Sequence, residues 1–363
     1  WKVISPDLST NNPEHQRGDY GGLTLDISGA EMYNSILSLA PSALDKNVLW
    51  AGTDDGQIQL TTDGGKSWKN LTKNVKGLPE EAWIAQIQAS RYQAGAAWVV
   101  ANNYRKGDYK PYLFKTEDFG KTWKRLADAS NVKGYSLSVI QDPVEPKLVF
   151  LGTENGLWVS VDEGSTWVQF KNGFPSVSTM DLVIQERESA LVVGTFGRAI
   201  WVLDDLKSLR EVAANRLKAS LTALPMNDAV QVKGLFINPP GNIWTGFHTT
   251  FEGENRPFQA TEIPFYLKEN PTKEAKVVAR IYNAKNEHLN TVEASGLKTG
   301  LNYLLWKLDA QVGTPKPNAS SREIPVLPGT YKVVLEYQGA KDSISVQVIP
   351  DPRFDIPASV DEK

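Results

Sequence analysis

The chain has 363 residues and a formal net charge of −3, which argues against nucleic acid or an anionic membrane surface as a partner. Because it contains no cysteine, disulfide bonds, thiol catalysis and thiolate metal sites are excluded. No apolar run reaches the roughly 18 residues that a membrane-spanning helix requires, so no span is expected.

The chain opens with WKVISP, and similar letters follow two later tryptophans, in WKNLTK from Trp68 and WKRLAD from Trp123. The segment from Asn11 to Met32 contains Pro13 and several glycines, so it is expected to form a long loop that could border a ligand surface. The tripeptide RGD at residues 17 to 19 occurs once, and chance explains it best.

Short β-rich runs follow, each bounded by Gly, Asp or Asn. Four of them hold equivalent places in a repeat: Val48 to Thr53, Ala97 to Asn102, Leu148 to Thr153 and Leu191 to Thr195. Further strands are expected at residues 83 to 90 and 178 to 185. Several short strands in each repeat of roughly 50 residues are typical of propeller blades. Residues 1 to 210 are therefore predicted to form about four blades of an all-β, partial β-propeller.

One octapeptide recurs between these strands: Ser/Thr, any, Asp, any, Gly, any, Ser/Thr, Trp. It reads TTDGGKSW at residues 61 to 68, TEDFGKTW at 116 to 123 and SVDEGSTW at 160 to 167. The aspartates are expected to bond backbone N–H groups two residues on, the glycines to supply a positive φ, and the tryptophans to start the next strand. These structural positions are Asp63, Gly65 and Trp68, then Asp118, Gly120 and Trp123, then Asp162, Gly164 and Trp167. Calcium binding is the weaker interpretation, because the octapeptide lacks the acidic density of an EF-hand loop.

The repeat stops near residue 204. Residues 204 to 218 are expected to form a short helix with Leu206, Leu209 and Val212 on one side. Residues 211 to 260 are predicted to connect two domains, because FINPPGN and FEGENRPFQATEIP carry boundary signals. Short, partly alternating strands predict an Ig-like β-sandwich over residues 261 to 350, with Trp306 and Tyr331 in its core. Residues 351 to 363 form a polar tail.

The octapeptides resemble Asp-boxes, also called BNR repeats, which mark hairpin turns in the propellers of sialidases, xyloglucanase-type glycosidases and the sortilin ectodomain. Residues 1 to about 210 also resemble a family of large exported bacterial proteins labelled BNR-repeat, sortilin-like or glycosyl-hydrolase proteins, to which no one reaction is tied. That resemblance rests on WKVISPDLSTNN, VLWAGTDDGQIQLTTDGGKSWKNLT, PYLFKTEDFGKTWK, LVFLGTENGLWVSVDEGSTW and LVVGTFGRAIWVLDDLKSLR. GLKTGLNYLLWKLDA with LPGTYKVVLEY is similar to the Ig-like domain of flagellar hook-capping proteins.

The family resemblance implies that further blades precede this chain and that Trp1 holds position eight of an Asp-box. The remaining blades are then expected from the same protein or from a second chain. The resemblance also implies export, to the periplasm, the cell surface or the medium. One departure is visible: the family usually has His where this chain has Phe196 in GTFGR, so no role of that His carries over.

Glycoside hydrolysis requires two carboxylates, about 5 Å apart in retaining enzymes and about 6.5 to 9.5 Å apart in inverting ones. The candidates follow equivalent strands, and they are Asp54, Asp55, Glu154 and the pair Asp204 and Asp205. Recurrence at equivalent places favours structural turns over a unique catalytic site. The three histidines, His15, His248 and His288, lack metal-binding spacing, so neither a metal nor a cofactor is expected.

An aromatic and basic loop supplies the candidate ligand contacts, Tyr104, Arg105 and Tyr109, to which Arg198 of a later blade is added. Such loops suit glycan stacking or protein contact, and an ordinary solvated loop is the more common alternative. The favoured hypothesis is a non-catalytic binding or scaffolding module of an exported or cell-surface protein. The alternatives are a sialidase-like or xyloglucanase-like glycoside hydrolase with its active site partly in missing blades, and a sortilin-type peptide receptor. Convergent carboxylates in a cleft would favour the hydrolase.

Overall fold

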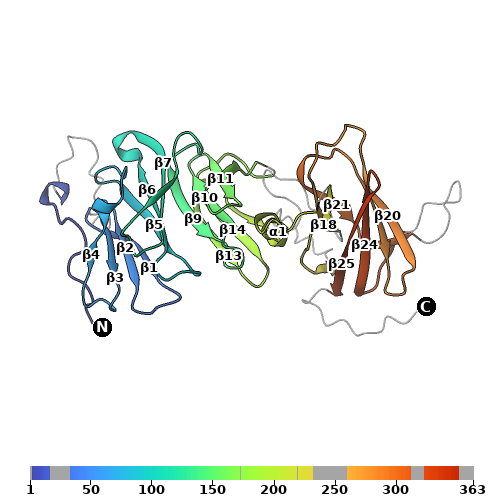
Figure 1. Ribbon diagram of the computed structural model, residues 1–363, viewed down its shortest axis with the longest axis horizontal. Coiled ribbons are helices and arrows are strands. Elements are labelled where there is room, and N and C mark those ends of the chain that lie inside the picture. Colours follow the sequence, from blue (N-terminus) through green and yellow to red (C-terminus); the bar gives the residue numbers. More distant parts are fainter. Residues whose placement is uncertain are drawn as a thin grey trace, which may run out of the picture. The chain divides into compact units, whose positions relative to one another are not determined.

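The structure of the chain, a computed structural model, describes residues 2–16, 33–171, 173–218, 220–231, 260–311 and 323–350 (Figure 1). The chain forms two compact units, Trp1–Asp204 and Asp205–Lys363. The RGD tripeptide, His248, the polar tail and most of the expected loop from Asn11 to Met32 lie outside the described residues.

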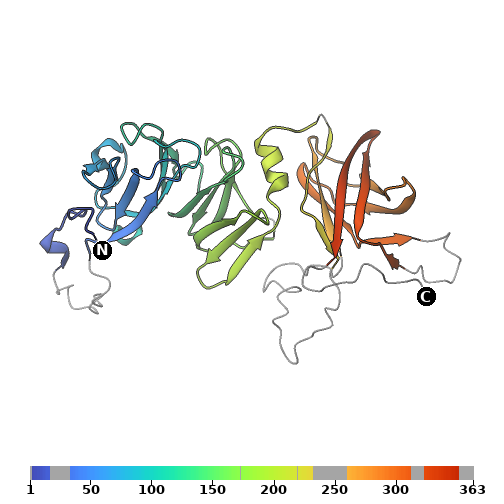
Figure 2. The ribbon, with the colours of Figure 1, turned by 90° about the horizontal axis from the view of Figure 1, so that it is seen from below.

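The first unit consists of small antiparallel sheets whose strands follow one another along the chain (Figures 1 and 2). The first sheet contains β1 (Ile36–Pro41), β2 (Leu49–Thr53), β3 (Ile58–Thr61) and β4 (Lys69–Asn70). The second contains β5 (Trp83–Ala89), β6 (Ala97–Asn103), β7 (Asp108–Thr116) and β8 (Lys124–Ala127). The third contains β9 (Ser136–Gln141), β10 (Val149–Thr153), β11 (Gly156–Ser160) and β12 (Val168–Gln169). The fourth, in the described residues, contains β13 (Thr179–Gln185), β14 (Ala190–Thr195) and β15 (Ile200–Leu203).

These sheets resemble the blades of a propeller, and the all-β, blade-type prediction for this unit is confirmed. Short 3₁₀ helices accompany them at Pro13–Gln16 (η1), Thr72–Asn74 (η2) and Tyr104–Lys106 (η3). The first strand of each later sheet packs against the preceding sheet: β5 contacts β1 and β2, β9 contacts β5 and β6, and β13 contacts β9 and β10. The middle strands are therefore covered on both faces, which explains the continuous apolar runs in β2 and β10.

Each Asp-box joins the third and fourth strands of its sheet. The first-position hydroxyl donates to Asp Oδ1 at 2.8, 2.9 and 2.7 Å in the three boxes. The seventh-position backbone N–H donates to the same oxygen at 2.9, 2.9 and 2.8 Å. The seventh-position hydroxyl donates to Asp Oδ2 at 2.6, 2.7 and 2.7 Å. The aspartate thus bonds an N–H four residues on, not two, because the turn contains two left-handed residues.

Those left-handed residues are positions four and five of the box. The fifth-position glycines Gly65, Gly120 and Gly164 have φ of 88°, 75° and 81°. The fourth position, which the sequence pattern left unspecified, also has positive φ, at 71° for Gly64, 60° for Phe119 and 58° for Glu163. Side chains other than glycine rarely adopt this region, so Phe119 and Glu163 are strained positions that the surrounding hydrogen bonds hold in place.

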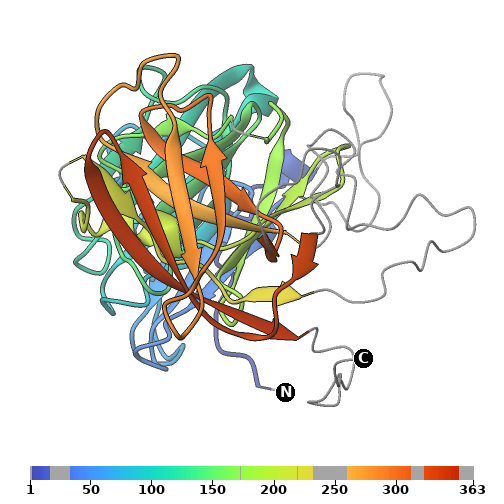
Figure 3. The same cartoon turned by 90° about the vertical axis from the view of Figure 1, so that its right-hand side faces the viewer.

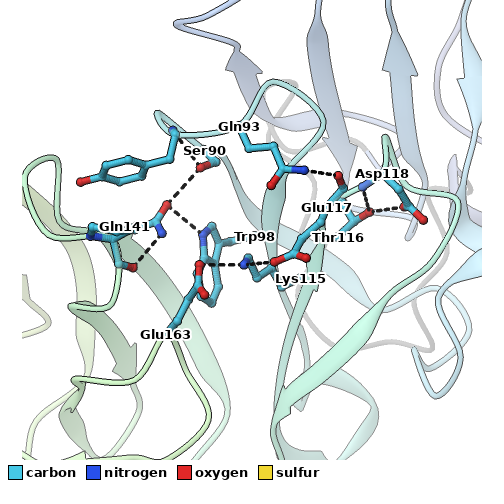
Figure 4. A network of polar contacts seen from close by, with 11 residues as sticks. Ser90, Gln93, Trp98, Lys115, Thr116, Glu117, Asp118, Gln141 and Glu163 are labelled. Atoms are coloured by element: carbon cyan, nitrogen blue, oxygen red, sulfur yellow. Dashed lines mark hydrogen bonds and ion pairs between the residues drawn. The ribbon is translucent and has the colours of Figure 1, made fainter. Parts of the chain in front are cut away.

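Lys115 joins the second sheet to the third (Figure 4). Its Nζ donates to Glu117 Oε1 at 2.5 Å and to Glu163 Oε1 of the third Asp-box at 2.8 Å. The same atom lies 5.4 Å from the centre of the Trp98 ring. Burial lowers the pKa of Lys115, but the hydrogen bonds that it donates to the two carboxylates outweigh burial and raise the pKa overall. The ammonium therefore stays charged inside a contact between two sheets.

The second unit contains, in its described residues, a three-stranded sheet, a five-stranded sheet and a short hairpin (Figure 3). One sheet contains β16 (Leu221–Ala223), β18 (Thr261–Leu267) and β21 (Gly300–Trp306). The other contains, in order, β17 (Ala229–Gln231), β25 (Ala340–Pro350), β24 (Gly329–Tyr337), β19 (Val277–Tyr282) and β20 (His288–Ala294). The hairpin pairs β22 (Asp309–Gln311) with β23 (Glu323–Pro325). β16 and β17 lie within residues 211 to 260, the segment expected to connect two domains.

One hydrophobic cluster is shared by both sheets of the second unit. Trp306 is fully buried in it and meets Tyr331 edge-on, with ring centres 5.5 Å apart. The Trp306 indole N–H donates to Asp309 O at 3.0 Å, and the Tyr331 hydroxyl donates to Leu327 O at 2.6 Å. Both residues are core residues, as the sequence predicted.

The unit begins with a single short helix in its described part, α1 (Lys207–Ala213). The helix is shorter than the predicted span of 204 to 218, because Asn215 adopts a left-handed φ of 56° and ends it. Its buried side chains are Ser208, Arg210 and Ala213, with Leu206 at the N-cap, so the predicted face of Leu206, Leu209 and Val212 is only partly correct.

Candidate functional site

The candidate ligand residues lie at one end of the sheets. In the first three sheets the turn between the second and third strands lies at the end of the third strand opposite the Asp-box, and the fourth sheet has a turn at the corresponding place. We call these turns the hairpin face; they comprise residues 54–57, 104–107, 154–155 and 196–199. The turns of the first, third and fourth sheets are each held by an equivalent backbone hydrogen bond. The backbone N–H groups of Asp54, Glu154 and Phe196 donate to the carbonyl oxygens of Ser35, Tyr135 and Ser178 at 3.1, 3.1 and 2.9 Å.

The candidate carboxylates of the first sheet bond to neighbouring segments of the chain. Asp55 is fully buried, and its Oδ2 accepts hydrogen bonds from the N–H and the hydroxyl of Thr10, both at 2.6 Å. Its Oδ1 accepts one from the Thr53 hydroxyl. Asp54 accepts one from Ser35 N–H at 2.8 Å, and burial raises its pKa, with the neighbouring charge of Asp55 adding to the effect. The two bonds from Thr10 attach the N-terminal segment to the first sheet.

Glu154 occupies the turn of the third sheet that corresponds to Asp54. The structure therefore places Glu154 in a different blade from Asp54 and Asp55. Asp205 belongs to the second unit, where its oxygens accept hydrogen bonds from Lys207 N–H at 3.1 Å and Asn227 N–H at 2.5 Å.

The aromatic and basic candidates of the second sheet come together with residues that the sequence analysis did not select. Tyr104 stacks on Tyr135 with ring centres 4.8 Å apart, and Tyr109 lies 6.2 Å from the same ring. Trp83 meets Tyr104 edge-on at 6.3 Å. The Arg105 guanidinium lies 3.7 Å from the centre of the Trp83 ring, an arrangement favoured by the negative face of indole. We call Trp83, Tyr104, Arg105, Tyr109 and Tyr135 the aromatic cluster.

A groove of about 680 Å³ adjoins the aromatic cluster. Its walls are the start of β7 and the segment between β8 and β9, and they include Tyr109, Lys110, Val132 and Lys133. Tyr109 is 58% exposed, so its ring is accessible from solvent and belongs to both the groove and the cluster. The groove thus combines an aromatic platform with two lysines, a combination suited to stacking and to acidic or polar ligand groups.

Two tyrosines near the groove resist ionisation. Burial, then the hydrogen bond to Asp108, raises the pKa of Tyr112 to about 12, and its hydroxyl donates to Asp108 Oδ2 at 2.6 Å. Burial, then the charge of Glu154, raises the pKa of Tyr135. Both side chains therefore remain neutral donors at neutral pH.

Trp83 and Tyr135 were missed because they are remote from Tyr104 in sequence. Trp83 begins β5, and Tyr135 immediately precedes β9, so both mark the entry of the chain into a sheet. The signal that could have found them is their place at the first strand of each sheet. Aligning the blades on that strand would have placed Trp83 and Tyr135 beside the hairpin turns. Arg198 lies exposed in the turn between β14 and β15, and the aromatic contacts just described do not include it.

The described residues contain no group of three His, Asp or Glu side chains arranged to hold a metal ion. In the part of the chain that the structure describes, no helix has both the length and the apolarity to cross a membrane.

No family model matches the chain. A vacuolar protein sorting/targeting protein 10 from Phaeosphaeria nodorum is 30% identical over 106 residues, which is 26% of this chain and 7% of that protein. The xyloglucanase Xgh74A from Acetivibrio thermocellus is 25% identical over 148 residues, 37% of this chain and 17% of that protein. The chain thus has distant sortilin-like and xyloglucanase-type relatives. They support the propeller-type, Asp-box resemblance, and the chain spans only a small fraction of their length.

Among solved structures, a Niastella koreensis GH74 enzyme matches 47% of this chain and 29% of its own, with 16% identity and a TM-score of 0.38. YCF48 from Cyanidioschyzon merolae matches 46% of this chain and 52% of its own, with 15% identity and a TM-score of 0.34.

Proposed function

We propose that the chain is a non-catalytic binding or scaffolding module of an exported or cell-surface protein, and that it recognises a protein or glycan partner through the hairpin face. The observation that carries this proposal is the aromatic cluster beside the groove. Tyr109 offers an exposed ring, Arg105 and the groove lysines offer charge, and the stacked rings of Tyr104 and Tyr135 hold the platform in place. Rigid aromatic side chains bind ligands at a low cost in conformational entropy.

The proposal includes two structural expectations from the sequence. The sheets of the first unit are blades of a larger propeller, with further blades supplied by the same protein or by a second chain. The second unit is an Ig-like β-sandwich that spaces or presents the propeller. Its support is a core shared by a three-stranded and a five-stranded sheet.

A glycoside hydrolase is the second candidate function, because the relative from Acetivibrio thermocellus is named as a xyloglucanase. The bonding of Asp55 to Thr10 and Thr53 argues against a catalytic role for that carboxylate. The sortilin-type relative instead favours a protein ligand.

The proposal is tested by titrating the chain with xyloglucan oligosaccharides and with an acidic peptide library while binding is measured by isothermal titration calorimetry. We expect one of the two probes to bind. Tyr109→Ala and Arg105→Ala should each weaken that binding at least tenfold. Tyr92→Ala is the matched control, because Tyr92 is exposed in the turn between β5 and β6, at the opposite end of the sheet. Equal losses in all three variants would overturn the site. Release of reducing sugar from xyloglucan, lost in Asp54→Asn, would favour the hydrolase.

A further inference from the structure

In the described part of the chain, one apolar face of the fourth sheet is largely exposed to solvent. Val183 of β13 pairs with Val192 of β14, which pairs with Val202 of β15, and Ile200 lies two residues before Val202. Ile200 is 72% exposed and Val202 is 49% exposed. Aliphatic side chains grouped at this exposure on one sheet face indicate a surface that normally contacts another element.

Equivalent positions are buried where another sheet follows. Ile58 and Leu60 of β3 pair with Gly52 and Trp50, as Ile200 and Val202 of β15 pair with Gly194 and Val192. Ile58 and Leu60 are 0% and 2% exposed, because the second sheet covers them. The equivalent residues of β3 and β15 are all aliphatic. Their difference in exposed fraction therefore comes from the second sheet, which covers β3.

The first sheet exposes the complementary half of this contact. Leu39 of β1 pairs with Ala51 and is 61% exposed. Val139 of β9 pairs in the same way with Leu151, and Leu182 of β13 pairs with Val193. Both are buried against the sheet that precedes them. Leu39 therefore occupies the first-strand position whose side chain, in the third and fourth sheets, packs against the preceding sheet.

The segment Lys2–Ile4 supplies a second complementary feature. Ile4 O accepts a hydrogen bond from the Trp68 indole at 2.9 Å, as Leu126 O accepts one from the Trp167 indole at 3.0 Å. Ile4 also lies against Gly65 of the first Asp-box, as Leu126 of β8 lies against Gly164 of the third. Lys2–Ile4 thus holds the place of a fourth strand before the first sheet, whereas the described part of the fourth sheet ends at its third strand, β15.

We propose that the face formed by Val183, Val192, Ile200 and Val202 is a docking surface for another sheet of the same kind, and that a second copy of this chain, joined head to tail, occupies it. Leu39 of one copy packs on Ile200 and Val202 of the other. Lys2–Ile4 of the first copy adds to the free edge of β15 as a fourth strand, which satisfies backbone groups that an edge leaves unpaired. The contact continues the sheet-to-sheet interface already repeated within the unit, and it is heterologous, so it closes a ring or extends a chain of copies. It does not rest on the ligand site.

The test is the mass of the full chain in solution, by sedimentation velocity and native mass spectrometry over a hundredfold range of concentration. We expect wild-type chain to self-associate. Val202→Glu and Leu39→Glu should each shift the midpoint of association at least tenfold upward in concentration. An equimolar mixture of the two variants should form a one-to-one dimer, because the unaltered Leu39 face of one variant meets the unaltered β15 face of the other.

Val144→Glu is the matched control, since Val144 is 64% exposed in the turn between β9 and β10 and should leave association unchanged. Circular dichroism establishes that each variant is folded before its mass is compared. Hydrogen exchange on the associated wild type should show slower exchange of the β15 amides. A wild-type chain that stays monomeric throughout, association that survives Val202→Glu, or a mixture of the two variants that does not pair would each overturn the proposal.

Discussion

Leu71 of the first sheet lies so close to Gly120 of the second Asp-box that a methyl group on Gly120 would come within 2.4 Å of Leu71 Cδ1. Gly120 also has a φ of 75°, so the backbone favours glycine there, and an added side chain would have to displace Leu71 of the preceding sheet. The Asp-box is therefore more than a turn: its fifth residue is the point at which one sheet packs against the sheet before it.

Replacement of Gly120 by alanine should lower the free energy of unfolding of the first unit by about 3 kcal/mol, because left-handed strain and a steric clash add. Gly107→Ala is the matched control, since Gly107 has a φ of 74° but no atom within 4 Å of an added Cβ. That control should lose only about 1 kcal/mol, from the left-handed backbone alone. Urea unfolding gives both values. Equal losses in the two variants would contradict a packing role for Gly120.

Asp118 accepts hydrogen bonds from Thr116, from the Thr122 N–H and from the Thr122 hydroxyl, and together these close the second Asp-box. Asp118→Ala should therefore reduce the free energy of unfolding by about 2 kcal/mol. Glu80→Ala, an exposed carboxylate outside the boxes, should change it by less than about 0.5 kcal/mol.

Calcium and EDTA separate this structural role from metal binding. The melting temperature of the wild type should be the same in either, because the Asp118 oxygens are used within the turn. A rise with calcium that Asp118→Ala removes would show instead that the box binds the ion.

The box aspartates also predict how stability depends on pH. Hydrogen bonds from Ser67 lower the pKa of Asp63 to about 2, and bonds from Thr122 lower the pKa of Asp118. For Asp162, burial acts to raise the pKa, but the bonds from Thr166 and Ser160 outweigh it and the pKa is lowered. A carboxylate whose folded pKa is depressed stabilises the fold above the unfolded value of about 3.9, and that contribution is lost as pH falls through the folded pKa.

The urea concentration at the midpoint of unfolding should therefore decrease as the pH is lowered from about 4 to about 2. The decrease should be smaller in Asp63→Asn than in the wild type, because the variant has no carboxylate to protonate at that position. Parallel curves for the two proteins over this range would show that Asp63 does not contribute.

The sequence predicted the elements better than their contacts. The strands fall on the apolar runs because each run must fill both faces of a covered sheet, and Trp306 was predicted in a core from its place in the strand NYLLWKL. The aromatic cluster could not be predicted, since Trp83, Tyr104 and Tyr135 meet only when the second sheet packs on the third. The role of Ile4 was hidden for the same reason: its equivalence to Leu126 depends on a contact across sheets. The left-handed φ of Phe119 and Glu163 escaped prediction because neither residue favours that conformation.

The groove beside the aromatic cluster offers a last prediction, on the ionisation of Tyr112. Asp108 lines the groove and accepts the Tyr112 hydroxyl hydrogen bond at 2.6 Å, and burial together with this carboxylate raises the pKa of Tyr112 to about 12. In Asp108→Asn the negative charge is removed, so the phenolate becomes less unfavourable and the pKa should move down toward the ordinary value of about 10. Tyrosine labelled with ¹³C at Cζ reports each ring separately by NMR, and Tyr112 should be mainly neutral in the wild type at pH 11 and more ionised in the variant. Asp128→Asn is the control, because Asp128 bonds to Ser130 and should leave Tyr112 unchanged. An unaltered Tyr112 titration in Asp108→Asn would mean that burial alone sets its pKa.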